Sequence, residues 1–445
     1  MNPTDMPRFG MTSALALAAG SAALTTPAAA AAPGEPIGAP IIVANSVNAI
    51  RVARAANGRM VASYLSAGTL MARRYAADGA PLGEAIAVTP LAGREQSGGV
   101  AIDADGDFVI AWSREDDRRT LVMARRYTSA GTAQGDDIEV ASLSTPDSTV
   151  GSVVDIDQGV GPVIVDMNAD GDFGVLYGDY RTSFIGNRLA CKYLIGAACV
   201  GDTTETLRLR RFDAAGVPRG PANLLTTATE NDVTLGGVVS GLRLGRIITG
   251  ADIETRADGS TLAAWSTQTR VAGTATSGLY TRVIGANGLA RLTRPVGPVS
   301  TTFRGDLRLD SSANGSHVLV HRSLRSATSS ETLDCGVELD LLAGDGSPQR
   351  PRIRVDQTPS GFDCLSNPDV SMDAAGNHVV AFREGNAVLA QRYAVGGGVL
   401  GGLFNVTDPG IVQQGPVIAS DAVGNFVIGY TLGTGDFVLR LHQGP

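Results

Sequence analysis

The sequence predicts an all-β protein, a seven-bladed β-propeller with four antiparallel strands per blade and a last blade closed by the N-terminal strand. Three observations lead to this prediction. A turn followed by an apolar strand recurs seven times along the chain, and in the clearest copies a strand ending in arginine follows it. The C-terminal unit lacks its fourth strand, and a matching segment stands near the N-terminus. Repeats of this length with four short strands are typical of propeller blades.

The first signature is a glycine turn that leads into an apolar strand, usually ending on an aromatic residue. Its clearest copy, from Asp103 to Trp112, reads DADGDFVIAW. Glycine is expected because such hairpin turns need a positive φ, which a Cβ disfavours. The other copies begin at Asn57, Asp170, Asp258, Asn314, Ala375 and Val423.

The second signature is a strand that ends in arginine and an aromatic residue, as in Arg73-Arg74-Tyr75 and Arg125-Arg126-Tyr127. Because these arginines recur at one position of the repeat, we expect them to serve the fold, with stems along the sheet and heads in water. A glycine-proline turn then leads to a short final strand. The predicted blades are residues 46–90, 97–142, 160–227, 247–300, 304–356, 366–407 and 415–442, in a single domain of residues 33–445.

The seventh unit is completed from the other end of the chain. Residues 34–43 read GEPIGAPIIV and match residues 79–88, which read GAPLGEAIAV. Residues 33–45 are therefore predicted to form the outer strand of the seventh blade by pairing with residues 437–442. Such closure leaves no open sheet edge between the chain ends.

The N-terminus predicts export. Arg8, an apolar stretch over residues 11–24 and alanines at 28–32 have the order of a signal peptide, assigned to residues 1–32. The apolar part is too short to span a membrane. We expect a secreted, periplasmic or cell-surface protein, and a monomer.

Charge argues against one class of partner, and cysteine content indicates the compartment. The formal charge is −8, Lys192 is the only lysine and no basic stripe occurs, so nucleic acid is not expected as a partner. Four cysteines allow three pairings and suit an oxidising compartment. We favour Cys191 with Cys199 and Cys335 with Cys364, because both pairs fall among insertions on one face of the disc.

The insertions follow a pattern. The longest predicted loops, between second and third strands or between blades, are residues 178–206, 228–246, 266–277, 322–333 and 358–367. All lie on one face over the third to fifth blades, and long loops on a rigid scaffold often carry binding residues. The alternative is that insertions accumulate where they do no harm. The predicted ligand-binding residues are Asp179, Tyr180, Arg181, Lys192, Tyr193 and Arg322.

Candidate catalytic and metal residues were weighed against ordinary structural roles. Two turns resemble calcium-binding loops, one with Asp103, Asp105 and Asp107 and the other with Asn168, Asp170 and Asp172. Their spacing departs from D-x-D-x-D-G. The preference of Asp and Asn for hairpin turns explains these residues better than calcium binding does. No cofactor is expected, and calcium is the alternative. Paired carboxylates for glycoside hydrolysis could come from Asp155, Asp157 or Asp166, although solvated loops are the simpler interpretation.

Two histidines stand where other copies have phenylalanine. His317 and His378 occupy the position of Phe108 and Phe173, so they are predicted to pack rather than to bind a ligand.

The blade motifs resemble those of exported bacterial repeat proteins that read D-x-x-G-[DN]-F-V-[VI]-A-W and A-[QR]-R-Y-x-x-x-G. The turn and aromatic strand also resemble, more distantly, the Asp-box of sialidase-like propellers, with a different spacing. The first resemblance implies an extracellular or envelope-facing role. We predict a non-enzymatic scaffold that binds a glycan or an envelope protein through the long-loop face; the alternative is a glycan-active hydrolase or lyase. Convergent carboxylates near the central channel would favour the enzyme.

Overall fold

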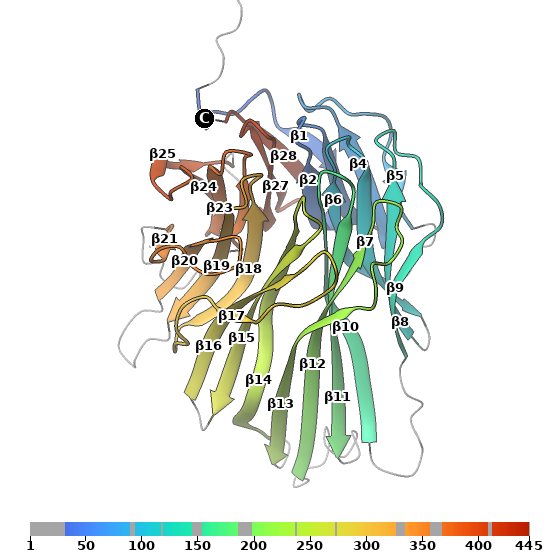
Figure 1. Ribbon diagram of the computed structural model, residues 1–445, viewed down its shortest axis with the longest axis vertical. Helices are drawn as coiled ribbons and strands as arrows, with labels where there is room; N and C mark the ends of the chain where they lie inside the picture. The colour runs from blue at the N-terminus through green and yellow to red at the C-terminus, as the bar shows by residue number, and fades with distance from the viewer. Residues whose placement is uncertain are drawn as a thin grey trace, which may run out of the picture.

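The computed structural model describes residues 32–89, 94–116, 119–144, 154–185, 198–235, 238–271, 274–325, 334–356, 367–407 and 412–444. Every helix or strand in these ranges is a β-strand, and the strands are numbered β1 to β28. The sheets are arranged around a common axis as a β-propeller, so the predicted all-β propeller class is confirmed (Figure 1). In the same ranges, no helix could span a membrane.

The strands form six antiparallel sheets, five of four strands and one of eight. The first two sheets are β2 (Val47–Arg54), β3 (Met60–Ser66), β4 (Thr69–Tyr75), β5 (Ile86–Ala87), and β6 (Arg94–Ile102), β7 (Phe108–Asp116), β8 (Arg119–Tyr127), β9 (Ile138–Ser144). The eight-stranded sheet is β10 (Val154–Met167), β11 (Phe173–Ile185), β12 (Ala198–Phe212), β13 (Asn223–Leu235), β14 (Val238–Thr255), β15 (Thr261–Val271), β16 (Thr274–Ile284), β17 (Arg294–Pro295).

Three four-stranded sheets complete the ring. They are β18 (Phe303–Ser311), β19 (His317–Arg325), β20 (Asp334–Leu342), β21 (Ile353–Arg354); β22 (Asp369–Met372), β23 (His378–Glu384), β24 (Ala387–Tyr393), β25 (Val399–Asn405); and β26 (Val412–Ser420), β27 (Phe426–Leu432), β28 (Phe437–His442) with β1 (Ile41–Ala44). The N-terminal segment thus completes the last sheet: Ile41 pairs with Leu439, and Ile37 donates its backbone N–H to Leu441 at 2.8 Å.

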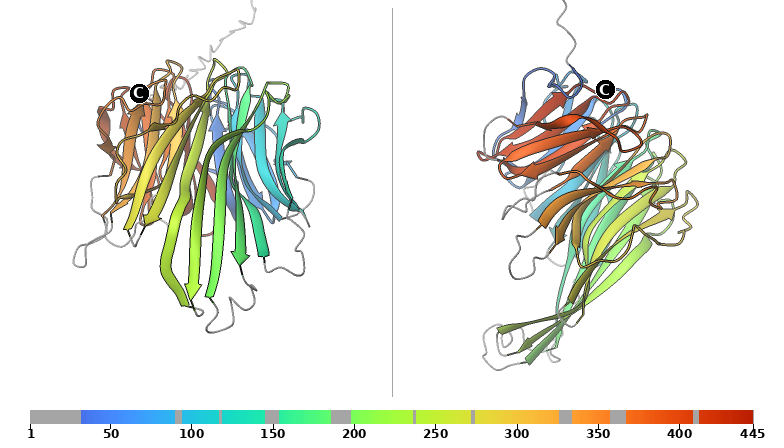
Figure 2. Two further views of the ribbon diagram at one scale, coloured as in Figure 1. Left: turned by 60° about the horizontal axis from the view of Figure 1, so that its bottom comes forward. Right: turned by 90° about the vertical axis from the view of Figure 1, so that its left-hand side faces the viewer.

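The prediction of separate third and fourth sheets is wrong. β13 runs on to Leu235 and pairs with β14, with Asn231 opposite Leu244 and Thr234 opposite Val239. The described parts of the segments 178–206 and 228–246, predicted as loops, are strands of a twisted arm of β10 to β14 that extends past the neighbouring sheets (Figures 1 and 2). The arm forms because its strands pair in sequence, β11 with β12, β12 with β13 and β13 with β14.

The other predicted loops have two outcomes. Residues 266–277 mostly continue the β15–β16 hairpin, in which Val271 pairs with Thr274. Residues 326–333 and 357–366 lie outside the described residues, as does the predicted signal peptide except for residue 32.

The core lies between neighbouring sheets. Trp112 on β7 packs with Val61 and Leu70 of the preceding sheet, and Val175 on β11 packs with Val109. Each sheet buries both faces, which accounts for strands of nearly continuous apolar residues such as FVIAW.

The repeated arginines join adjacent sheets, and the expectation that their heads lie in water is wrong. Arg74 donates from Nη1 to the carbonyl of Ser129 at 2.6 Å, and Arg210 donates to that of Val140 at 2.6 Å. Arg211 is buried and donates to the carbonyl of Gly285 at 2.8 Å. These bonds satisfy carbonyls at turns and sheet ends that have no strand partner.

Candidate active site

A cavity of about 600 Å³ occupies the axis of the propeller. Seven strands line it, each the innermost of its repeat: β2, β6, β10, β14, β18, β22 and β26. A second cavity, of about 300 Å³, is lined by the segments that precede β22 and begin β26, and it shares Arg51, Asp306 and Arg308 with the first. We call the shared region the mouth. The two volumes lie within or near the range of small-molecule sites.

Most inner strands are irregular near the mouth, and this irregularity sets which side chains face the axis. The register shifts between Asn48 and Arg51 in β2 and between Gly305 and Arg308 in β18. Ala49 and Asp306 take positive φ values of 55° and 48° there. β-bulges bend a strand and redirect its side chains, and strained backbone of this kind gathers at functional sites.

Three carboxyl groups, which we call the deep tier, lie on the channel wall five residues before a turn glycine: Asp166, Glu254 and Asp310. Asp166 accepts the backbone N–H of Thr255, and Asp310 accepts that of Met372 at 2.6 Å. Glu254 accepts the hydroxyl of Ser311 at 2.6 Å. Each contact reaches the next inner strand, so the carboxyl groups hold neighbouring strands together and are themselves held in place.

Burial favours the protonated form of the deep tier. Desolvation raises the pKa of Asp166 to about 7, and the nearby Asp310 adds to the shift. Desolvation likewise raises the pKa of Asp310 to about 7, and it raises the pKa of Glu254, with further increases from Asp166 and Asp310. Like charges in a low-dielectric space cannot all ionise, so proton donors are present near neutral pH.

A second group, the mouth tier, lies two residues earlier on the inner strands: Arg51, Asp252, Arg308 and Asp369. Asp252 accepts the N–H of Leu309 at 2.9 Å, and Asp369 accepts that of Ile418 at 3.0 Å. Nε of Arg308 lies 3.9 Å from a carboxylate oxygen of Asp369.

Arginines moderate the electrostatics of the mouth tier. Burial raises the pKa of Asp252 to about 6, and Arg308 opposes the shift. Burial also raises the pKa of Asp369, which Arg308 and Arg51 counteract. Desolvation, followed by repulsion from Arg308, lowers the pKa of Arg51 to about 10. Burial thus raises the pKa of the carboxyl groups in both tiers, and in the mouth tier the charges of the arginines oppose this rise.

The residues predicted to bind a ligand lie largely away from this cavity. Asp179, Tyr180 and Arg181 are on β11 in the arm, where burial raises the pKa of Asp179 and Arg208 lies 3.8 Å from it. Arg322 is nearer, since its Nε lies 2.9 Å from Asp306 at the mouth. Lys192 and Tyr193 lie outside the described residues.

The three aspartates that the sequence offered for glycoside hydrolysis lie in different parts of the structure. Asp155 and Asp157 are on the arm part of β10, whereas Asp166 is in the channel, so a solvated loop is the wrong interpretation for Asp166. The sequence analysis missed Asp252, Glu254, Asp310 and Asp369. Aligning the copies on their turn glycines could have found Glu254 and Asp310, because the deep-tier position is alanine in three repeats and acidic in three.

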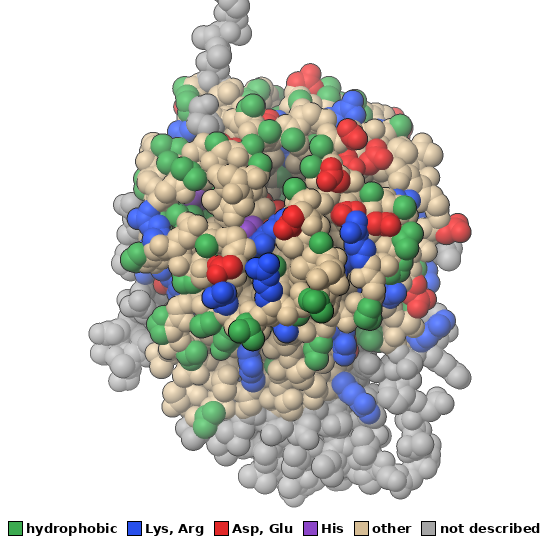
Figure 3. Space-filling model, viewed as in Figure 1, with side chains coloured by type: hydrophobic (Ala, Val, Ile, Leu, Met, Phe, Trp, Pro, Cys, Tyr) green, Lys and Arg blue, Asp and Glu red, His purple; other side chains and the backbone are tan. Residues whose placement is uncertain are grey.

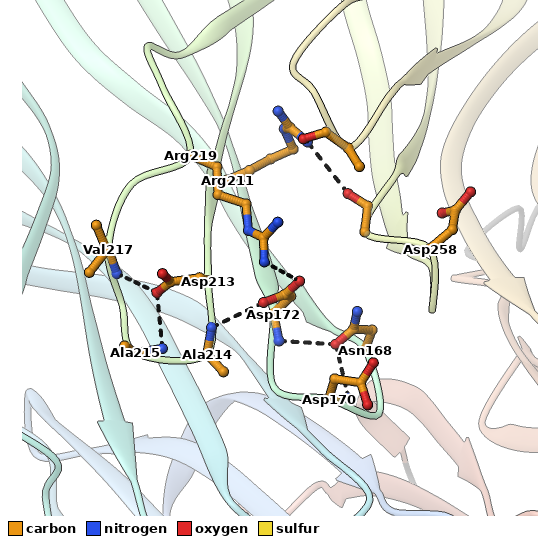
Figure 4. A network of polar contacts seen from close by, with 12 residues as sticks. Asn168, Asp170, Asp172, Arg211, Asp213, Ala214, Ala215, Val217, Arg219 and Asp258 are labelled. Carbon is orange, nitrogen blue, oxygen red and sulfur yellow. Dashed lines mark hydrogen bonds and ion pairs between the residues drawn. The ribbon is translucent and has the colours of Figure 1, made fainter.

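In the candidate calcium loops, the first side chain of each turn accepts hydrogen bonds from backbone N–H groups of the same turn. Asp103 accepts the N–H groups of Asp105 and Asp107 at 3.0 and 2.9 Å, and Asn168 accepts those of Asp170 and Asp172 at 3.1 and 3.0 Å. Figure 4 shows Asp172 reaching Ala214 and Arg219 in the connection between β12 and β13. In the part of the chain that the structure describes, no group of three or more His, Cys, Asp and Glu residues could hold a metal ion.

The described histidines His317 and His378 are buried, and one of the described cysteines is disulfide-bonded. His378 stacks on Tyr393 with ring centroids 5.3 Å apart, as Phe108 stacks on Tyr127 at 4.8 Å, so its packing role is confirmed. His317 is buried, with Nε2 2.9 Å from Arg256. Cys335 on β20 is disulfide-bonded and Cys199 is in β12, but Cys191 and Cys364 lie outside the described residues, so the pairing stays a prediction.

Arginine and acidic side chains are interspersed on the face shown in Figure 3, and the side chains coloured there form no extended basic patch.

No family model and no curated protein sequence matches this chain. Among solved structures, polysaccharide lyase Uly1 has a TM-score of 0.49 at 10% identity, covering 94% of each chain. The α-L-arabinanase of Penicillium chrysogenum, complexed with arabinobiose, has a TM-score of 0.45 at 11% identity, covering 79% of this chain and 93% of that one. The Dos1 propeller has a TM-score of 0.40 at 10% identity, covering 89% and 80%. Identities this low bear on architecture, and no site residue is carried over from them.

The prediction of a non-enzymatic scaffold is overturned. The segments expected to form a binding loop face are, where the structure describes them, strands of the arm. The channel also holds the convergent carboxyl groups that were stated to favour an enzyme.

Proposed function

We propose that this protein is a glycan-active enzyme, a glycoside hydrolase that works in the central channel. One observation carries the proposal: carboxyl groups from different strands line one cavity in two different environments. In the deep tier burial favours the protonated carboxyl, and in the mouth tier the charge of neighbouring arginines opposes the rise in pKa that burial causes. Glycoside hydrolysis needs such a pair, an acid that keeps its proton and a carboxylate that has lost it.

Asp310 is proposed as the acid. Its pKa, raised to about 7 by desolvation, leaves a proton available near neutral pH. Hydrogen bonds from Met372 at 2.6 Å and Ser311 at 2.7 Å fix the carboxyl group against the inner strands. The negative charge of Asp369 adds to this rise in the pKa of Asp310.

Asp369 is proposed as the ionised partner, since Arg308 and Arg51 favour its charged form. In the proposed reaction Asp310 gives its proton to the glycosidic oxygen as the bond from that oxygen to the anomeric carbon breaks. Asp369 takes a proton from a water molecule, whose oxygen forms the new bond to the anomeric carbon. The products are a free reducing sugar and an alcohol, and the two carboxyl groups then exchange the proton to restore the starting state.

The test is release of reducing sugar from a panel of linear arabino-, galacto-, gluco-, xylo- and uronate oligosaccharides. We expect cleavage of at least one member, and a loss of roughly 100-fold or more in kcat/KM for Asp310→Asn and for Asp369→Asn. The matched control is Asp107→Asn, which changes an aspartate that accepts the N–H of Ser129 at 2.7 Å in a turn outside the cavity lining. Equal activity in the wild type, Asp310→Asn and Asp369→Asn would refute the assignment, as would products with ultraviolet-absorbing unsaturated ends, which indicate elimination.

Two further properties belong to this proposal. We propose seven blades, with β10–β13 and β14–β17 as two of them, because seven inner strands line the cavity and the sequence repeats seven times. We also propose export and action outside the cytoplasm, supported by the signal-like residues 1–32 and by resemblance to exported repeat proteins. N-terminal sequencing of protein recovered outside the cytoplasm tests the export, and an N-terminus near residue 33 is expected.

A further inference from the structure

The channel wall is divided into a polar part and a small apolar part at one level. The position five residues before each turn glycine is polar on four consecutive inner strands, β10, β14, β18 and β22, where it holds Asp166, Glu254, Asp310 and Ser371. On the three remaining strands, β26, β2 and β6, the same position holds Ala419, Ala53 and Ala101. All seven residues line the 600 Å³ cavity.

This division suits a sugar ring. A pyranose or furanose has faces of C–H groups and a rim of hydroxyls, so its rim can bind the carboxyl groups while a face lies on the alanines. The side chains on that side are short; Ala53 is partly exposed, whereas Ala101 and Ala419 are buried in the cores between sheets.

The cavity geometry constrains how a polymer could enter. Seven strands surround the cavity, so a chain that reaches the deep tier enters along the axis of the ring. The mouth cavity of about 300 Å³ adjoins the deep one at Arg51, Asp306 and Arg308, next to the proposed reacting carboxyls. A chain that enters through the mouth would place its end in the deep cavity and its next unit at the mouth.

On the basis of the proposed function, we propose that the channel binds the end of a glycan chain and that the enzyme is exo-acting. The terminal sugar lies between the alanine part and the acidic part of the wall, and the bond cut is the one near the mouth. The substrate class is therefore a chain with a free, unbranched end.

The test uses the panel oligosaccharide that is cleaved, labelled at one end, with products separated by length over time. Release of short terminal products from the earliest time points is expected, and a chain with bulky caps at both ends should resist cleavage. Fragments of all lengths at early times, or cleavage of the doubly capped chain, would overturn the inference and leave the proposed hydrolysis intact. If no panel member is cleaved, the proposed function fails and this inference fails with it.

A variant tests the alanine part separately. Ala53→Leu should raise KM by about 10-fold or more with a smaller effect on kcat, because it fills binding space without touching the carboxyl groups. Ala80→Leu, at an exposed turn position, is the matched control. Thermal unfolding of both variants establishes that the folds are intact, and an unchanged KM in folded Ala53→Leu would contradict the placement of the sugar.

Discussion

Replacing Asp166 with asparagine should stabilise this protein, and more so at high pH. Asp166 is ionisable in the channel wall, and desolvation raises its pKa from 3.8 to about 7. Between these values the folded state binds the proton more tightly than the unfolded state. Stability therefore falls as the pH rises from about 4 to about 7, which is the sign expected for an acid with a raised pKa.

The size of the effect follows from the same two pKa values. With a folded pKa of about 7 and an unfolded value of 3.8, linkage gives a penalty of about 4 kcal/mol at pH 8 and about 2 kcal/mol at pH 5. The amide of Asp166→Asn keeps an oxygen that can accept the N–H of Thr255 and has no charge to bury. The variant should therefore gain about 2 to 3 kcal/mol relative to the wild type on going from pH 5 to pH 8.

Urea unfolding followed by circular dichroism at the two pH values measures this difference. Thr281→Val is the control, since Thr281 is buried outside the cavity lining and donates its hydroxyl to the carbonyl of Gly346 at 2.8 Å without titrating. Its cost of about 1 kcal/mol should be the same at both pH values. Parallel pH dependences for the wild type and Asp166→Asn would refute the reasoning about a buried, proton-retaining channel.

Three other outcomes test the fold. Removing residues 34–44 should cost about 4 kcal/mol or more of stability, compared with a chain that begins at residue 32. The reason is that Val43 is buried and that Ile37 and Ile41 pack against the same cluster. An unchanged melting temperature would contradict ring closure by β1. Arg211→Met should cost about 2 kcal/mol in urea unfolding, because it removes the bonds from a buried guanidinium to the carbonyls of Gly285 and Ala286. No loss would show that this link between β12 and the turn after β16 is dispensable. Burial lowers the pKa of His378 to about 4, so the folded protein holds this histidine in its neutral form and loses stability as the pH falls from about 6.5 to about 4. His378→Phe should remove this loss. An unchanged fall in melting temperature over that pH range would contradict the reasoning.

The closing strand was predictable because its signal is local. Residues 34–43 repeat the pattern of residues 79–88, and the structure pairs Ile41 with Leu439 as that match implies. The turn glycines were likewise readable, since Gly106 has a φ of 90° that a residue with a Cβ adopts only under strain.

The arm was missed because strand length depends on partners. Residues 226–235 carry threonine, glutamate and aspartate without a clear alternation, which alone fits a loop as well as a strand. In the structure β12 and β14 flank this segment and supply its hydrogen bonds. Pairing with the strands on either side decided the outcome, and the residue pattern of a single segment does not show its partners.

The channel carboxyls were missed for a different reason. Asp310 and Asp369 each stand alone in the sequence among residues that fit a solvated turn. Their convergence arises from the register of seven strands and from the bulges near Ala49 and Asp306, which turn side chains toward the axis. The usable signal was the departure from the repeat, an acid where other copies have alanine, because such a residue does not serve the repeat itself.

The most direct test of the central claim is the pH dependence of kcat/KM for the wild type and for Asp310→Asn on one cleaved oligosaccharide. The wild type should lose activity as the pH rises through about 7, where desolvation places the pKa of Asp310 and where the acid loses its proton. Asp310→Asn should be roughly 100-fold or more slower at every pH while remaining folded. A variant that hydrolyses the substrate at the wild-type rate, with the wild-type profile, would contradict an active site in the channel.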